Sequence, residues 1–175
     1  NIRLLAKALD KPVDEIVVSV LNRPRHAQLI EDIRASGAGT RLMSDGDVAG
    51  GINAARHNAR TDMCVGVGGS PEGIVTACAI KALGGHIQGR LWPRDDDEKQ
   101  KGIDAGLRLD DYVYEAEGLV RGSNTIFVAT GVTNGELVAG VRRAGDFIYT
   151  ESVVLRGRSG TLRRIASEHL TSKWL

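Results

Sequence analysis

Strand-like and helix-like segments alternate along most of the chain. IVVSVL (16–21) is an apolar, β-branched run of strand length, and HAQLIEDIRASG (26–37) then repeats its apolar residues at helical spacing before a glycine. The same order predicts further strands at 40–44, 62–67, 86–92 and 125–132 and further helices at 2–9, 44–56, 70–85 and 93–106. Because strands that alternate with helices build right-handed βαβ units, we expect an α/β fold with a mostly parallel sheet and helices on both faces.

The last part of the chain has a different pattern. TNGELVAGV (133–141) predicts a turn and a short helix, and the segments on either side of RSG (158–160) predict a β-hairpin. With 175 residues, 42% of them hydrophobic, the chain can bury one sizeable core. Residues 1–175 are therefore expected to form a single α/β domain.

Charge and composition argue against two classes of partner. Basic and acidic residues number 23 and 22 and aromatic residues make up 4%, which argues against a nonspecific nucleic-acid binder. No apolar run reaches the roughly 18 residues that a membrane helix needs, and no signal peptide is recognisable. The two cysteines lack the CxxC spacing of a redox or metal pair. Two free thiols fit a reducing compartment, so a cytoplasmic location is expected.

The loops that follow the predicted strands are the candidate sites, because ligands of open α/β sheets bind beyond the carboxyl ends of the strands. Four polar loops qualify: NRPRH, SDGD, GGSPEG and ATGVTNG. In the first, Arg23 and Arg25 flank the rigid Pro24. A guanidinium group binds phosphate bidentately and keeps its charge, so this loop predicts an anion site, unless the two arginines are ordinary surface residues.

The second loop places Asp45 and Asp47 on either side of Gly46. Asp-Gly is common turn chemistry, and Asp47 is a suitable N-cap for the helix that follows. Alternatively, the two carboxylates accept hydrogen bonds from the hydroxyl groups of a sugar, or orient the neighbouring arginines. The residues alone leave both interpretations open.

The third loop combines an anion-binding feature with an acid. Gly68 and Gly69 expose backbone N–H groups at the positive end of a helix that Ser70 is predicted to cap. Glu72 lies in the first turn of that helix, where the helix dipole stabilises an acid. A carboxylate there also suits Mg²⁺ or Mn²⁺, and such a cation would let the acid and a phosphate share one site.

The histidines predict no metal site. The four of them have no spacing typical of metal ligands, and no GxSxG, GxxxxGK[ST] or regular GxGxxG motif occurs. Only His26, beside the arginines, is a candidate, and packing at a helix N-terminus is its expected role.

Five segments occur in an order that resembles one known family. They are RPRHAQLIEDIRASGA, SDGDVAG, GVGGSPEGIVTACAIKALGGHIQGRL, ATGVTNGELVAGV and SVVLRGRSGTLRRI, and together they span nearly all 175 residues. Their order is similar to the C-terminal half of class II fructose-1,6-bisphosphatases, the GlpX family. The resemblance implies the lithium-sensitive sugar-phosphatase fold, with layers in the order α/β/α/β/α. It also implies metal-dependent hydrolysis of the 1-phosphate of fructose 1,6-bisphosphate in gluconeogenesis and, in some members, hydrolysis of sedoheptulose 1,7-bisphosphate.

The resemblance also implies roles for particular residues. Its substrate-binding residues match Arg23, Pro24, Arg25, Asp45, Gly46, Asp47 and Gly69, and its metal carboxylate matches Glu72. Mg²⁺ or Mn²⁺ is the implied cofactor. The catalytic residues and other metal ligands belong to an N-terminal half that has no counterpart here, so this chain alone is expected to be inactive.

The expected partners are a small sugar bisphosphate, the N-terminal half of the same protein and further copies in a homo-oligomer. Two departures from the family pattern are Asn22, where the family has an acid, and the residues that flank GRSGT. A non-catalytic sugar-phosphate-binding module and an unrelated α/β domain that binds another anion remain alternatives.

Overall fold

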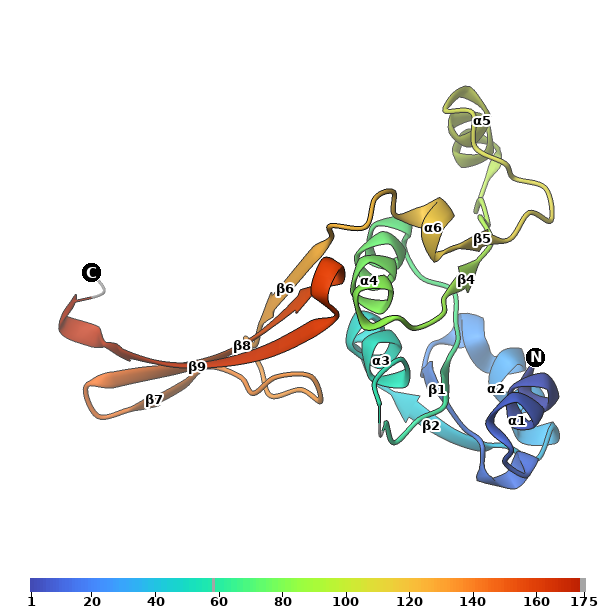
Figure 1. Ribbon diagram of the computed structural model, residues 1–175. Helices are drawn as coiled ribbons and strands as arrows, with labels where there is room; N and C mark the ends of the chain where they lie inside the picture. Colours follow the sequence, from blue (N-terminus) through green and yellow to red (C-terminus); the bar gives the residue numbers. More distant parts are fainter. Residues whose placement is uncertain (58, 174–175) are drawn as a thin grey trace.

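Helices and sheets alternate as layers in this α/β protein (Figure 1). The computed structural model describes residues 1–57 and 59–173. A parallel sheet has helices on both faces, and a second, antiparallel sheet packs on the outer side of one helical layer. The α/β class expected from the sequence is confirmed.

The parallel sheet has the strand order β2–β1–β3, formed by Gly39–Met43, Val17–Leu21 and Met63–Cys64. β1 is the central strand and pairs in parallel with both neighbours, and its residue Val18, opposite Met63, is fully buried. An apolar, β-branched segment suits this position, because a central parallel strand is covered on both faces.

Two helical layers cover this sheet. On one face, α1 (Ile2–Leu9) and α2 (Ala27–Ala35) pack against β1, and on the other lie α3 (Asp47–Ala54) and α4 (Ser70–Leu83). The core on the first face contains Ala6, Ile16, Val18, Val20, Ile30, Ile33 and Ala38. Gly37 has a φ of 89° and follows α2, as the sequence predicted for the end of that helix.

The second sheet is antiparallel, which differs from the expectation of a mostly parallel sheet. β8 (Phe147–Arg156) pairs with β9 (Thr161–Leu170) on one edge, and with β6 (Ile126–Thr130) and β7 (Arg142–Ala144) on the other. The predicted hairpin around 158–160 is confirmed, but β6 does not extend the parallel sheet. Parallel pairing needs a crossover connection, and no α-helix lies between β6 and β9 in the described chain.

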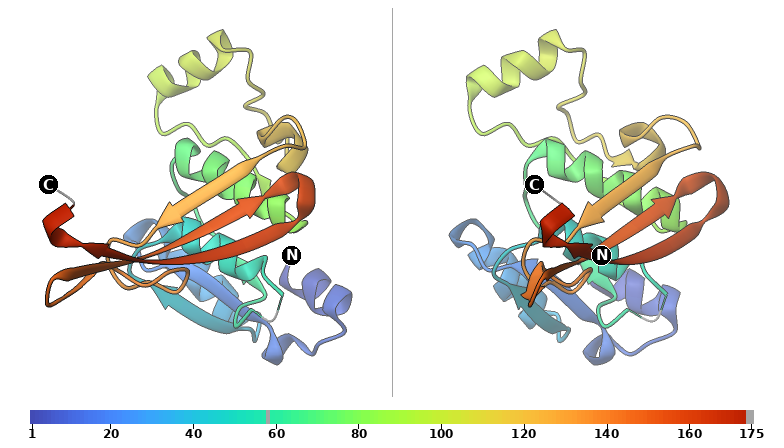
Figure 2. Two further views of the ribbon diagram at one scale, coloured as in Figure 1. Left: turned by 60° about the vertical axis from the view of Figure 1, so that its left-hand side comes forward. Right: turned by 90° about the vertical axis from the view of Figure 1, so that its left-hand side faces the viewer.

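α3 and α4 lie between the two sheets, so the layers follow the order helix, sheet, helix, sheet (Figures 1 and 2). The core between these helices and the antiparallel sheet contains Ile52, Ala79, Ala82, Phe127, Leu137, Val138, Val153 and Leu155. The open end of the hairpin β8–β9, where β8 begins and β9 ends, extends beyond this core and lies far from the parallel sheet (Figure 1).

The short helix expected at 133–141 is absent, and this segment is a loop. Its backbone folds closely on itself, because the Gly135 N–H donates to the Val138 carbonyl oxygen at 3.1 Å and the Gly140 N–H to Asn134 Oδ1 at 2.9 Å. In a helix these backbone N–H groups would donate to carbonyl oxygens one turn earlier. Asparagine and glycine favour the turn contacts instead.

A separate excursion connects α4 to β6. β4 (Gln88–Gly89) pairs antiparallel with β5 (Tyr114–Glu115), and the chain between them carries α5 (Asp96–Asp104), which projects from the body (Figure 1). The strand expected at 86–92 is therefore shorter and does not join the parallel sheet. α6 (Ala116–Leu119) brings the chain back to α4. Among the described helices, none has both the length and the apolar character needed to cross a membrane.

Candidate functional site

Three loops meet at the carboxyl edge of the parallel sheet. The arginine loop (22–26) follows β1, the aspartate loop (44–47) follows β2, and the glycine loop (65–69) follows β3. Parallel strands end at the same edge of a sheet, which brings these loops together. The fourth predicted loop, after β6, belongs to the antiparallel sheet and lies elsewhere.

Val67 joins the arginine loop to the glycine loop. Arg25 Nε donates to the Val67 carbonyl oxygen at 2.9 Å, and the Val67 N–H donates to His26 Nε2 at 2.8 Å. Two consecutive residues of the arginine loop therefore hold both main-chain polar groups of one residue in the glycine loop.

His26 is only 1% exposed and is bonded at both ring nitrogens. Since Nε2 accepts the Val67 N–H, the proton lies on Nδ1, which donates to the Leu21 carbonyl oxygen at 2.9 Å. Gly66 packs against the same ring, and a Cβ there would lie 3.1 Å from His26 Cε1. The sequence predicted only a packing role for His26, because its partner lies 41 residues away and leaves no local pattern.

Arg23 and Arg25 are held differently. Pro24 starts a single 3-10 turn, and Arg23 before it has an extended backbone. Among the described residues, the Arg23 guanidinium donates only to the Asn22 carbonyl oxygen, at 3.3 Å. The Nη1 and Nη2 groups of Arg25 have no acceptor in the described part of the chain. Arg25 thus presents a fixed guanidinium whose outer edge is open, whereas no other loop holds Arg23.

Asp47 reaches the glycine loop and Asp45 does not. Gly46 has a positive φ of 77° and precedes α3, so Asp47 is the first helical residue rather than the expected N-cap. Its Oδ2 lies 3.0 Å from the position that a Cβ on Gly68 would take. Asp45 is exposed and makes no hydrogen bond or ion pair to any described residue.

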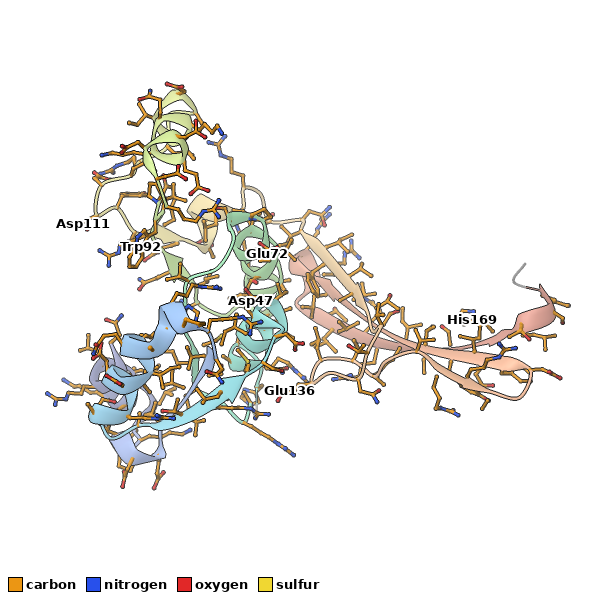
Figure 3. The ribbon with its side chains drawn as sticks, turned by 180° about the vertical axis from the view of Figure 1, so that it is seen from behind. Asp47, Glu72, Trp92, Asp111, Glu136 and His169 are labelled. Carbon is orange, nitrogen blue, oxygen red and sulfur yellow. The ribbon has the colours of Figure 1, made fainter. Side chains whose placement is uncertain are left out.

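Glu72 lies beside Gly69 at the start of α4. Gly69, and not Ser70 as expected, is the N-cap, since its backbone is extended and the helix begins at Ser70. The Glu72 carboxylate folds back over Gly69, where a Cβ would overlap Glu72 Oε2. Figure 3 shows Asp47 and Glu72 at the first turns of the neighbouring helices α3 and α4.

Backbone donors are available next to these carboxylates. The N–H groups of Gly68, Gly69 and Ser70 have no acceptor among the residues that the structure describes. They lie at the positive end of the α4 dipole. Together with the open edge of the Arg25 guanidinium, they form a set of donors suited to a phosphate group.

Cys64, at the end of β3, is unsuited to nucleophilic attack. Burial raises the pKa of the Cys64 thiol, and the negative charge of Asp47 raises it further, although the hydrogen bond with the Ser19 hydroxyl opposes both effects. A thiol with a raised pKa stays protonated at neutral pH.

The two carboxylates fit part of a divalent-metal site. Asp47 and Glu72 approach consecutive glycines, and carboxylate oxygens are the ligands that Mg²⁺ and Mn²⁺ prefer. Within residues 1–57 and 59–173, no group of three or more His, Cys, Asp or Glu side chains is placed to hold a metal. The chain therefore offers carboxylates that can share a metal with phosphate, but not a complete metal cage.

Comparison with known proteins points to the same family as the order of the sequence motifs. Residues 1–169 match the family described as bacterial fructose-1,6-bisphosphatase, glpX-encoded. The chain is 41% identical to a class 2 fructose-1,6-bisphosphatase of Haemophilus influenzae, with 97% of this chain and 54% of that protein covered. It is 37% identical to a class 2 D-fructose 1,6-bisphosphatase/sedoheptulose 1,7-bisphosphatase of Trichodesmium erythraeum, with 97% and 53% covered. The chain thus spans about half the length of the curated relatives it matches.

One solved structure, a sugar N-methyltransferase from a Streptoalloteichus species, aligns over 96% of this chain and 68% of its own. The TM-score of 0.26 and the identity of 13% are too low to indicate a shared fold.

Proposed function

The chain belongs to the family of bacterial glpX-encoded fructose-1,6-bisphosphatases, and on that premise we propose that it supplies the sugar-phosphate-binding half of a metal-dependent phosphatase. The proposed reaction is hydrolysis of the 1-phosphate of fructose 1,6-bisphosphate, a step of gluconeogenesis. Sedoheptulose 1,7-bisphosphate is a proposed second substrate, because two relatives carry that activity in their names.

The observation that carries this proposal is the double attachment of Val67. Arg25 and His26 together fix the glycine loop against the arginine loop. This attachment sets the free amides of the glycine loop and the open edge of the Arg25 guanidinium on adjoining loops. A phosphate bound there would receive charge-assisted hydrogen bonds from groups that need little reorganisation.

The remaining residues would recognise the rest of the substrate. Arg25 binds the phosphate that is not cleaved, and Arg23, on the other side of Pro24, adds a second positive charge when the ligand orders it. Asp45 and Asp47 accept hydrogen bonds from the sugar hydroxyls, since carboxylates are acceptors only. Gly46 and Gly69 let the backbone approach the ligand closely.

Glu72 is the proposed metal carboxylate of this chain, with Asp47 as a neighbouring acid. When bound, Mg²⁺ or Mn²⁺ would neutralise charge on the scissile phosphate and lower the pKa of the attacking water. Glu72 holds its carboxylate beside Gly69 and would keep that oxygen close to the amides that bind phosphate. The other metal ligands and the residues that activate water are proposed to come from an N-terminal half of the same protein.

The metal role of Glu72 is tested with Glu72→Gln in the full-length product of the gene. Phosphate release from fructose 1,6-bisphosphate is expected to fall by at least about tenfold, because one metal ligand is lost. Glu31→Gln, which changes an exposed acid on α2, is the matched control. Undiminished phosphate release by Glu72→Gln would contradict the metal role.

The phosphate role of Arg25 has a separate test. Arg25→Ala is expected to raise KM by about tenfold or more, since it removes charged hydrogen bonds to the substrate. Arg34→Ala, at an exposed position of α2, is the control. A KM equal to that of the unchanged protein would refute the proposed phosphate contact.

A non-catalytic sugar-phosphate-binding module is the second candidate. It is favoured by the incomplete set of metal ligands among the described residues. The module would bind fructose 1,6-bisphosphate in an Arg25-dependent way without releasing phosphate in the presence of Mg²⁺ or Mn²⁺. Measurable Glu72-dependent release by the full-length product would exclude this candidate.

A further inference from the structure

A basic cavity lies at the opposite end of α3 from the candidate site. Its volume is about 340 Å³, and it is bordered by β2, the last turn of α3, the segment that follows and the loop after β6. α3 has 8 residues, a length of roughly 12 Å at 1.5 Å per residue, which separates the cavity from Asp47. The polar lining residues are Arg41, Asn53, Arg56, His57, Arg60, Thr61 and Glu136.

Positive charge is in excess in this cavity. Among the described residues, three guanidinium groups line it against the single carboxylate of Glu136, which forms an ion pair with Arg41. Arg56 and Arg60 have no carboxylate partner in the described part of the chain. The formal net charge of the whole chain is only +1, so this excess is a local feature of the cavity.

Hydrogen bonds order one side of the cavity before any ligand binds. Asn53 Nδ2 donates to Glu136 Oε2 at 3.0 Å, and Asn53 Oδ1 accepts from Arg56 Nη1 at 3.4 Å. Arg41 lies in β2, where its backbone is paired with Ser19 of β1. This arrangement lowers the entropy lost when a ligand binds, whereas Arg60 is exposed and can close over an anion.

Ordinary structural roles explain only part of this arrangement. A cation after the last turn of α3 is stabilised by the helix dipole, which accounts for Arg56. The ion pair with Glu136 explains the presence of Arg41, because this pair connects the loop after β6 to β2. Neither role requires Arg60, and neither explains why the cavity between these residues lacks a second acid.

We propose that this cavity binds a small phosphomonoester dianion, of which inorganic phosphate is the minimal form. Arg56 and Arg60 would hold the phosphate oxygens through their planar guanidinium forks, and the Asn53 amide would add a neutral donor. The volume matches the lower end of small-molecule sites, so an organic group of the ligand also fits. Glu136 would accept a hydrogen bond from a hydroxyl of that group. This site is separate from the site of the proposed reaction, and it does not depend on catalysis.

Phosphate titration of this chain, followed by NMR of backbone amides and arginine Nε–H groups at constant ionic strength, tests the proposal. The Arg25→Ala variant is used, so that phosphate bound at the arginine loop does not contribute. Added phosphate is expected to shift the signals of Asn53, Arg56 and Arg60. Arg56→Gln/Arg60→Gln in the same background is expected to weaken the phosphate affinity of these signals by about tenfold or more.

Two controls make the outcome decisive. Arg3→Gln/Arg34→Gln removes the same charge from exposed positions of α1 and α2 and is expected to leave phosphate affinity unchanged. Arg56→Lys/Arg60→Lys keeps the charge without the planar fork and is expected to restore only part of the binding. The proposal is overturned if phosphate shifts no cavity signal. It is equally overturned if both glutamine pairs weaken binding to the same extent, because general charge would then explain the effect.

Discussion

At the residue level, the candidate site divides into side chains that the fold holds and side chains that a ligand must order. Arg25 and His26 are bonded to Val67, and the carboxylates of Asp47 and Glu72 lie against consecutive glycines. The side chains of Arg23 and Asp45, by contrast, are exposed and form no hydrogen bond or ion pair with another site loop in the described part of the chain. We infer that the first group sets the geometry of the site and that the second contributes only when substrate is present.

His26 is expected to act as a positioning residue for the glycine loop. His26→Gln keeps an acceptor near the Val67 N–H. His26→Asn instead keeps an N–H donor near the Leu21 carbonyl oxygen. In the full-length product, we expect His26→Asn to raise the KM for fructose 1,6-bisphosphate by about tenfold. His26→Gln is expected to raise it less, and kcat is expected to change little in either variant.

The steady-state KM and kcat of the two variants check this prediction. His86→Gln, at an exposed histidine, is the control and should behave like the unchanged protein. If the asparagine variant keeps the lower KM of the two, the bond to Leu21 matters more than the bond to Val67, and the positioning role is wrong.

At the level of elements, loops and strand ends are joined by side chains as well as by strand pairing. Asp62, just before β3, accepts hydrogen bonds from the Val17 N–H at 2.9 Å and from Lys11 Nζ at 2.6 Å. Its carboxylate thus ties the start of β1 to the chain that enters β3, and its side chain is 13% exposed. These attachments hold β3 at the amino edge of the parallel sheet, where β3 pairs over only two residues.

Asp62→Asn is expected to reduce stability in a pH-dependent way. Burial by itself raises the pKa of Asp62, but the hydrogen bonds from Lys11 and Val17 outweigh it and hold the pKa below its usual value of 3.8. The stabilisation is therefore complete above pH 3.8 and is lost as the pH falls through the lower folded value.

Urea unfolding at several pH values measures this effect. At pH 7 the variant should lose about 1–2 kcal/mol, and the two curves should converge in strongly acid solution. An equal loss at every pH would show that the charge of Asp62 is not responsible.

The loop after β6 offers a second stability test. A Cβ on Gly140 would lie 2.5 Å from the Thr133 carbonyl carbon and 2.6 Å from the Asn134 nitrogen, and neither backbone atom can move easily. Gly140→Ala is therefore expected to cost about 1–3 kcal/mol in the free energy of unfolding. Gly73→Ala, in α4 with open space around it, should instead be neutral or stabilising. Equal thermal midpoints for the two variants would contradict the close packing of this loop.

At the level of the whole molecule, the two helical layers and two sheets place phosphate donors and carboxylates at one edge, while the basic cavity opens at the other end of α3. Among the described residues, the carboxyl edge of the parallel sheet has too few metal-binding side chains to enclose a metal ion without substrate. Metal and phosphate are therefore expected to bind with positive coupling, since each supplies the charge that the other needs.

Mn²⁺ affinity, measured by titration with and without phosphate, checks this coupling. Phosphate is expected to increase the Mn²⁺ affinity of this chain by at least about fivefold, and Glu72→Gln should abolish the increase. The control Glu31→Gln should retain it. Mn²⁺ affinity that is independent of phosphate would contradict a shared site.

Agreement between sequence and structure is best where the signal is local. The strand at Val17–Leu21 and the helices that follow the first three strands were predicted, since periodicity and glycine positions report on short segments. The caps of α3 and α4 were each displaced by one residue, because a glycine took the N-cap in both cases. The helix at 133–141 was wrong, because turn contacts between asparagine and glycine residues replaced the helical bonds.

The sequence by itself determined the α/β class, the order of the loops and the residue types that can bind phosphate and metal. These features depend on neighbours within a few positions, which the order of residues records directly. Only the tertiary structure decided that the second sheet is antiparallel, that Val67 is held by Arg25 and His26, and that Arg41, Arg56 and Arg60 line one cavity. Apart from the local hairpin β8–β9, these features join segments that are not neighbours in the chain. Their pairing is set by the packing of whole layers rather than by local preference.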